Sequence, residues 1–190
     1  MTIPAPIGAG YTEDKAMSKL KNKRGTSKGE FVNKAIDIRQ NTAEFLARLS
    51  ARYARLYAQD IQHLANAVSI YTEEAQSMRP TDATRYELRK GYLLKARAAL
   101  NALDNMMLDI YTVLMKNPLG AFDDLKKKAE KRVEDVDGYR IHQQCSAEAV
   151  KRLDHMAETL GCLIEDEEAL INGVLNSDKK TFAAAKAEQK

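Results

Sequence analysis

The sequence predicts an all-α protein, an antiparallel up-down four-helix bundle with a disordered N-terminal tail. The first observation is composition: 190 residues include only 9 Gly and 4 Pro, whereas strong helix formers such as Ala, Leu, Lys and Glu are abundant. The second is that apolar residues recur every three or four positions through four long segments, without the alternation typical of strands. Four helices that each carry one apolar stripe can bury those stripes only against one another.

The bundle is predicted to begin after a flexible tail. Residues 1–26 contain Gly, Pro and Lys without a helical stripe. Ser27 and Glu30 then have the spacing of a capping box, in which each side chain accepts a hydrogen bond from a free backbone N–H group. Apolar residues follow at helical spacing from Phe31 to Phe45, so the first helix is expected to start at Ser27.

The second helix has the most regular stripe. It ends before Pro80, because the residue that precedes a proline is disfavoured in the helical conformation. The pattern does not settle whether this helix continues from the first or bends near Ser50. The residues of the stripe are Tyr53, Tyr57, Ile61, Leu64, Val68, Tyr71, Ala75 and Met78.

A third helix is predicted to follow after a short connection. Thr81 and Asp82 are candidate N-caps, a stripe runs from Leu93 to Leu114, and the pair Asn117 and Pro118 ends it. So few residues separate the second and third helices that they should form an antiparallel hairpin.

The last third of the chain predicts one weak and one strong helix. Residues 123–136 are charged and poorly amphipathic, and residues 137–138 (Asp-Gly) are a candidate break. The bundle is predicted to cover residues 27–182, with residues 183–190 as a frayed tail. The final stripe contains Ile141, Cys145, Ala149, Leu153, Met156, Leu160, Leu163 and Leu170 or Ile171.

Composition also restricts the cellular setting. A mean hydropathy of −0.49 and the lack of a long apolar run exclude a membrane span. The N-terminus has no basic start followed by an apolar stretch, as a signal peptide would. Cys145 and Cys162 lie on one predicted helix about five turns apart, too far to pair within the chain. We therefore expect a cytoplasmic, reduced protein.

No set of residues predicts catalysis, and we expect neither an enzyme nor a bound cofactor. The glycines do not form a phosphate-binding loop after a strand, and Glu-x-x-His, the motif of di-iron bundles, does not occur. The one conceivable metal set is His142, Cys145, His155 and Cys162. Only His142 and Cys145 share a helix face, so we predict no metal and interpret the cysteines as core or partly buried thiols.

The charges suggest an anionic partner. The net charge is only +3, but basic residues gather in residues 15–28 and 126–132, and acidic residues in 165–168. The acidic run is interpreted as a solvated or partner-facing patch. Arg and Lys on the second and third helices accompany several tyrosines, a combination suited to RNA or single-stranded DNA. The residues predicted to neutralise phosphates are Arg52, Arg55, Arg85, Arg89, Lys90 and Arg97.

Apolar residues beside the stripes predict self-association, because leftover apolar surface usually marks a partner or a symmetric oligomer. The alternative is a protein-binding module, an inhibitor or adaptor, that docks the acidic run and its flanking Leu163 and Leu170 on a basic protein. One continuous positive face would favour nucleic acid, and scattered charge with an apolar groove would favour a protein. The flanking apolar residues are Leu49, Leu56, Leu94, Met106 and Val113.

Five segments carry a resemblance to a known group: residues 24–31 (RGTSKGEF), 64–71 (LANAVSIY), 78–82 (MRPTD), 85–96 (RYELRKGYLLKA) and 170–182 (LINGVLNSDKKTF). Together they resemble small four-helix-bundle proteins of phages and gut bacteria. That group is similar to the accessory variability determinant of diversity-generating retroelements and to proteins encoded in ribosomal-RNA intervening sequences. The resemblance implies a homo-oligomeric, non-enzymatic accessory protein that binds nucleic acid and partners a reverse transcriptase. The mild net charge, the acidic last helix and the long tail depart from this group.

Overall fold

Helices make up the computed structural model, which describes residues 29–130 and 136–188. Within these ranges no strand occurs, so the prediction of an all-α protein is confirmed. The predicted tail over residues 1–26 lies outside the described residues. The elements are α2 (Glu30–Arg48), α3 (Ala51–Ser77), α4 (Ala83–Met115), the 3-10 helix η1 (Pro118–Ala121), α5 (Asp123–Glu130) and α6 (Val136–Glu188).

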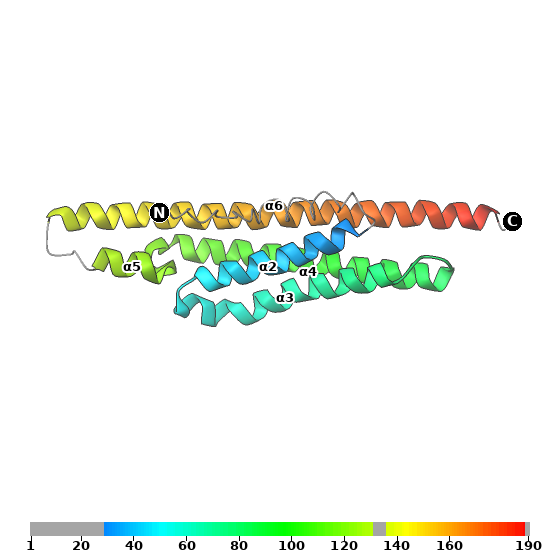
Figure 1. Cartoon of the computed structure of the whole chain (residues 1–190), viewed down its shortest axis with the longest axis horizontal. Helices are drawn as coiled ribbons and strands as arrows, with labels where there is room; N and C mark the ends of the chain where they lie inside the picture. Colours follow the sequence, from blue (N-terminus) through cyan, green and yellow to red (C-terminus); the bar gives the residue numbers. More distant parts are fainter. Residues whose placement is uncertain (1–28, 131–135, 189–190) are drawn as a thin grey trace, which may run out of the picture.

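The long helices lie side by side in an elongated molecule (Figure 1). α2 packs against α3 and α6, and α4 packs against the same two helices. α6 runs along the whole molecule, and the short α5 lies beside its N-terminal part. Each long helix therefore presents its apolar stripe to two neighbours.

α2 and α3 are separate helices, and the chain turns between them at Leu49 and Ser50. Leu49 and Ser50 have extended backbones, with ψ angles of 152° and 148°. The backbone N–H of Ser50 donates to the carbonyl oxygen of Ala121 (2.7 Å), and its hydroxyl donates to that of Gly120 (3.0 Å). The buried Ser50 thus links this corner to η1.

The connection between α3 and α4 agrees with its prediction. α3 ends at Ser77, ahead of Pro80, and Asp82 is the N-cap of α4. The Asp82 carboxylate accepts a hydrogen bond from the backbone N–H of Arg85 (2.9 Å), and this bond lowers the pKa of the Asp82 carboxyl.

Three predicted boundaries differ from the structure. The N-cap of α2 is Gly29 without a side-chain cap, and Ser27 lies outside the described residues. The predicted break at Asp137 and Gly138 is wrong, because α6 begins at Val136 and contains both residues; a single glycine costs a helix only about 1 kcal/mol. α6 also remains helical to Glu188, beyond the predicted boundary at residue 182.

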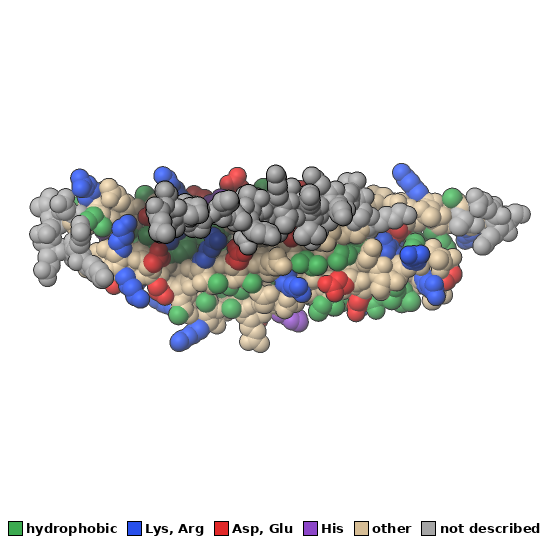
Figure 2. Space-filling view, viewed as in Figure 1, with side chains coloured by type: hydrophobic (Ala, Val, Ile, Leu, Met, Phe, Trp, Pro, Cys, Tyr) green, Lys and Arg blue, Asp and Glu red, His purple; other side chains and the backbone are tan. Residues whose placement is uncertain are grey.

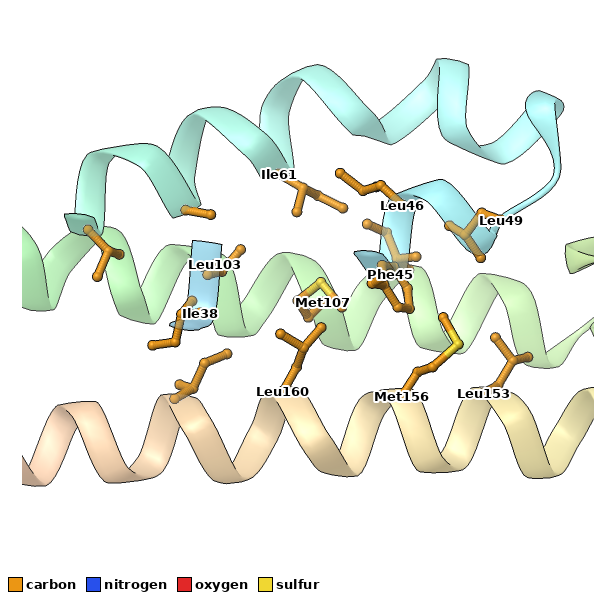
Figure 3. Packing of buried hydrophobic residues seen from close by; sticks show 14 of the residues in the cluster. Ile38, Phe45, Leu46, Leu49, Ile61, Leu103, Met107, Leu153, Met156 and Leu160 are labelled. Atoms are coloured by element: carbon orange, nitrogen blue, oxygen red, sulfur yellow. The ribbon is translucent and has the colours of Figure 1, made fainter. Parts of the chain in front are cut away.

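The core forms where the stripes meet. In Figure 3, Ile38, Ile61, Leu103 and Leu160, one from each long helix, point into a common interior. Every apolar residue of the predicted α4 stripe is buried. These residues are Leu93, Ala96, Leu100, Leu103, Met107, Ile110 and Leu114.

Candidate binding surfaces

The basic residues predicted to contact phosphates do not form one surface. Arg52 and Arg55 are exposed at the start of α3, whereas Arg85, Arg89 and Lys90 lie at the start of α4, beyond the opposite end of α3. α3 has 27 residues, which corresponds to about 40 Å at a rise of about 1.5 Å per residue. The structure therefore divides the predicted set into two groups, with Arg97 between them.

Arg89 faces the interior and does not belong to the surface. It is 8% exposed, and its guanidinium forms an ion pair with Asp178 of α6 (2.5 Å). It also donates to the carbonyl oxygens of Ala75 (2.6 Å) and Met78 (3.0 Å) at the end of α3. The last carbonyls of a helix lack partners within it, so Arg89 caps α3 and links three helices. Its predicted role in phosphate binding is corrected to a structural one.

The basic residues at the start of α3 and those at the start of α4 differ in whether acidic side chains already pair with them. Arg85 pairs with Asp82 (3.5 Å) and Lys90 with Glu87 (3.2 Å). Within the described ranges, neither Arg52 nor Arg55 forms an ion pair. The start of α3 therefore carries the more available positive charge.

Charge is scattered over the face seen in Figure 2. Lys and Arg side chains are spread along its length and alternate with Asp and Glu. No single positive surface covers the described part of this face.

A groove between α4 and α6 is the most apolar surface feature. We call it the α4–α6 groove, and it contains a hollow of about 240 Å³. Leu108, which is 64% exposed, forms one wall, and Gly161 of α6 forms the other. Among the described residues, no atom other than those of Gly161, its chain neighbours and the adjacent backbone of α6 lies within 4 Å of the point where a Cβ would stand. The remaining lining includes Asp104, Met107, Tyr111, Ala157 and Ile164.

Polar contacts cross the groove and hold its walls in place. The Tyr111 hydroxyl donates to the Asp154 carboxylate (2.6 Å), which raises the pKa of Tyr111. Farther along, Arg97 donates to Asn172 (3.1 Å). Two predicted phosphate contacts, Arg97 and Lys90, thus lie along this groove, where Lys90 lines a second hollow of about 190 Å³.

Of the apolar residues predicted to mediate self-association, Leu94 and Leu56 are exposed, by 41% and 62%. Leu49 is buried in the core, which corrects its assignment as leftover surface. Met106 and Val113 are partly buried. Leu94 lies at the α4–α6 groove, beside its second hollow.

Glu167 is a buried acid that the sequence interpretation missed. The run 165–168 is not one solvated patch, because Glu167 is 0% exposed and neither of its carboxylate oxygens has a hydrogen-bond partner among the described residues. Burial raises the pKa of Glu167 to about 9, and attraction to Lys34 opposes this rise. Its neighbour Asp166 pairs with Lys34 of α2 (3.0 Å). The sequence did contain an indication that Glu167 is buried, because it lies at helical spacing in the series Leu160, Ile164, Glu167 and Ile171.

The other residues considered for chemistry lie apart. Cys145 is buried as predicted, but Cys162 is exposed, which corrects its assignment as a partly buried thiol. Among the residues that the structure describes, no three His, Cys, Asp or Glu side chains come close enough to hold a metal ion. No described helix is long and apolar enough to cross a membrane.

Comparisons with protein-family models, curated proteins and solved structures give no match. The resemblance to retroelement accessory proteins therefore remains a prediction.

Proposed function

We propose that this protein is a non-catalytic scaffold that acts by binding another protein chain along the α4–α6 groove. The observation that carries the proposal is an exposed leucine, Leu108, at the wall of an apolar hollow. Large exposed apolar side chains beside a groove are typical of protein interaction sites. The basic residues predicted to bind phosphates are divided between the two ends of α3, and some of them already pair with acidic residues. Both facts favour a protein partner over nucleic acid.

The architecture suits such a role. We interpret the four long helices as an antiparallel up-down bundle, with α5 as an addition beside α6. The support is the short connections between α2, α3 and α4, together with the alternating chain direction in Figure 1. In such a bundle, α4 and α6 are neighbours over a long distance, and their outer groove offers a rigid surface.

The test is site-specific photo-crosslinking. A benzophenone amino acid in place of Leu108 should give protein adducts in cells that express the chain, and these adducts should survive nuclease treatment. The control position is His63, which is exposed on α3. Adducts that disappear with nuclease, or that form equally at position 63, would contradict the proposal.

A second candidate function is binding of RNA or single-stranded DNA at the start of α3. Arg52 and Lys126 line one hollow of about 450 Å³. Lys126 pairs with Glu130 of the same hollow (3.8 Å), so among the described residues Arg52 is the cation there that is free to neutralise a phosphate. A reverse transcriptase partner, implied by the sequence resemblance, would accompany this function.

Reversing charge at Arg52 and Arg55 tests the second candidate. We expect Arg52→Glu with Arg55→Glu to weaken binding of a single-stranded RNA at low salt by roughly tenfold or more. The slope of log affinity against log salt should fall by about 0.7 for each lost phosphate contact. Fluorescence anisotropy over a salt series would measure both quantities.

The matched control is Arg85→Glu with Lys90→Glu, at the other end of α3. This pair makes the same change in net charge, but both residues already have acidic partners. Equal loss from the two double variants would show that binding depends on overall charge and not on a site at the start of α3.

A further inference from the structure

We propose that the α4–α6 groove holds α4 of a second copy of this chain, in an antiparallel pair whose two-fold axis passes near Asn101. The inference rests on the proposed function, since it uses the same groove, and it goes further by naming the occupant. Three features carry it: a regular outer stripe on α4, the self-complementary order of that stripe, and the missing side chain at Gly161.

The outer face of α4 carries its own stripe. Leu94, Asn101 and Leu108 are spaced by seven residues, which places them on one face of the helix. Asn101 is exposed, as are both leucines. Arg97 and Asp104 lie between them and complete steps of three and four residues. This spacing is the one with which two helices pack lengthwise.

The order of the residues along this stripe is self-complementary. In an antiparallel pair centred on Asn101, Leu94 of each copy faces Leu108 of the other, because each lies seven residues from the centre. Arg97 lies four residues before the centre and Asp104 three residues after it, so the Arg97 side chain of each copy comes close to the Asp104 side chain of the other and opposite charges meet twice. A two-fold interface requires one surface to complement itself in this way, and like charges would oppose it.

The groove also has room for a side chain of the incoming helix. Leu94 of the second copy would lie beside Leu108, at the hollow of about 240 Å³. The far wall of this hollow is Gly161, where the position of a Cβ faces open space within the described part of the chain. A helix surface without a side chain allows another chain to approach closely.

Filling the gap at Gly161 should separate the two copies without disturbing the fold. In light scattering or sedimentation of the full chain after nuclease and high-salt treatment, we expect a dimer for the unchanged protein. Gly161→Arg should weaken dimerisation by at least about tenfold, a change of about 1.4 kcal/mol. Gly173→Arg is the matched control, because Gly173 is equally open but lies about 120° around α6 from Gly161. Both variants should melt at a similar temperature.

Charge exchange tests the pairing of particular residues. Arg97→Asp and Asp104→Arg should each weaken the dimer, since each places like charges opposite one another. Mixing these two variants should restore dimerisation, because every acidic side chain of one then faces a basic side chain of the other. Combining both substitutions in one chain should restore it as well. The two positions are about 10 Å apart along α4, so contact within one chain does not explain the rescue.

The outcomes separate this inference from the proposed function. A dimer unaffected by Gly161→Arg and by the charge variants would overturn the α4 pairing. A monomer that crosslinks to a different protein at position 108 would overturn it too, and would leave the docking role of the groove intact. A monomer without protein adducts would overturn both proposals.

Discussion

Replacing Glu167 with leucine should stabilise the protein by about 3 kcal/mol in mildly alkaline solution. Glu167 is fully buried, and within the part of the chain that the structure describes its carboxylate oxygens have no hydrogen-bond partners. Burying an ionised or unpartnered polar group is unfavourable. Ile164 and Ile171 flank it on the same stripe, so a leucine would continue the apolar layer. The measurement is chemical denaturation of both proteins.

The pH dependence gives this prediction a specific form. In the folded protein the pKa of Glu167 is about 9, whereas the ordinary pKa of a glutamate side chain, which applies to the unfolded chain, is 4.5. Below pH 4.5 the carboxyl is protonated in both the folded and the unfolded state, so its titration does not affect stability. Between these values the unfolded chain releases a proton that the folded chain retains, and stability should fall by at most about 1.4 kcal/mol per pH unit. Above pH 9 the loss is complete.

Two further variants separate the effects of titration and of polarity. Glu167→Gln should remove the fall in stability between the two pKa values, yet leave unpartnered polar atoms in the core, so it should stabilise less than Glu167→Leu. Glu168→Gln, at an exposed neighbouring position, should leave the pH profile unchanged. If the unchanged protein and Glu167→Gln had the same profile, the Glu167 carboxyl would not be held protonated.

The stripes explain how much of the fold was predictable. α4 was predicted well because only apolar residues occupy its core positions from Leu93 to Leu114. α6 was harder because Leu163 and Ile164 are adjacent and either could continue the stripe. The core follows Ile164, which is 6% exposed, while Leu163 is partly buried. Because the core follows Ile164, Glu167 lies inside it. A search for apolar residues at helical spacing does not identify an acidic residue at a core position.

The candidate surfaces were less predictable than the fold. Helical spacing indicates which face a residue occupies, but not which residues of other helices meet it. Arg89 lies four residues before Leu93, so the stripe of α4 already includes it. Asp178 likewise lies seven residues after Ile171. Only the packing of α4 against α6 pairs these two charges, and only that packing forms the α4–α6 groove.

Replacing Arg89 with methionine should destabilise the fold by about 3–5 kcal/mol, because it leaves a largely buried charge without its partner. Asp178 has a side chain that is only 16% exposed and pairs with Arg89. The substitution also removes the donor to the carbonyl oxygens of Ala75 and Met78. Chemical denaturation would measure the loss. The matched control is Arg85→Met, since the Arg85 side chain is 61% exposed and such surface pairs contribute about 1 kcal/mol or less.

Changing both partners distinguishes a structural from a binding role for Arg89. Arg89→Met combined with Asp178→Leu should recover much of the lost stability, because no charge is then buried alone. If Arg89 instead contacted phosphates, Arg89→Met would weaken nucleic-acid binding while the free energy of unfolding stayed close to that of Arg85→Met. The buried geometry predicts the reverse: a large loss of stability that the second substitution repairs, and nucleic-acid affinity in the repaired protein close to that of the unchanged chain.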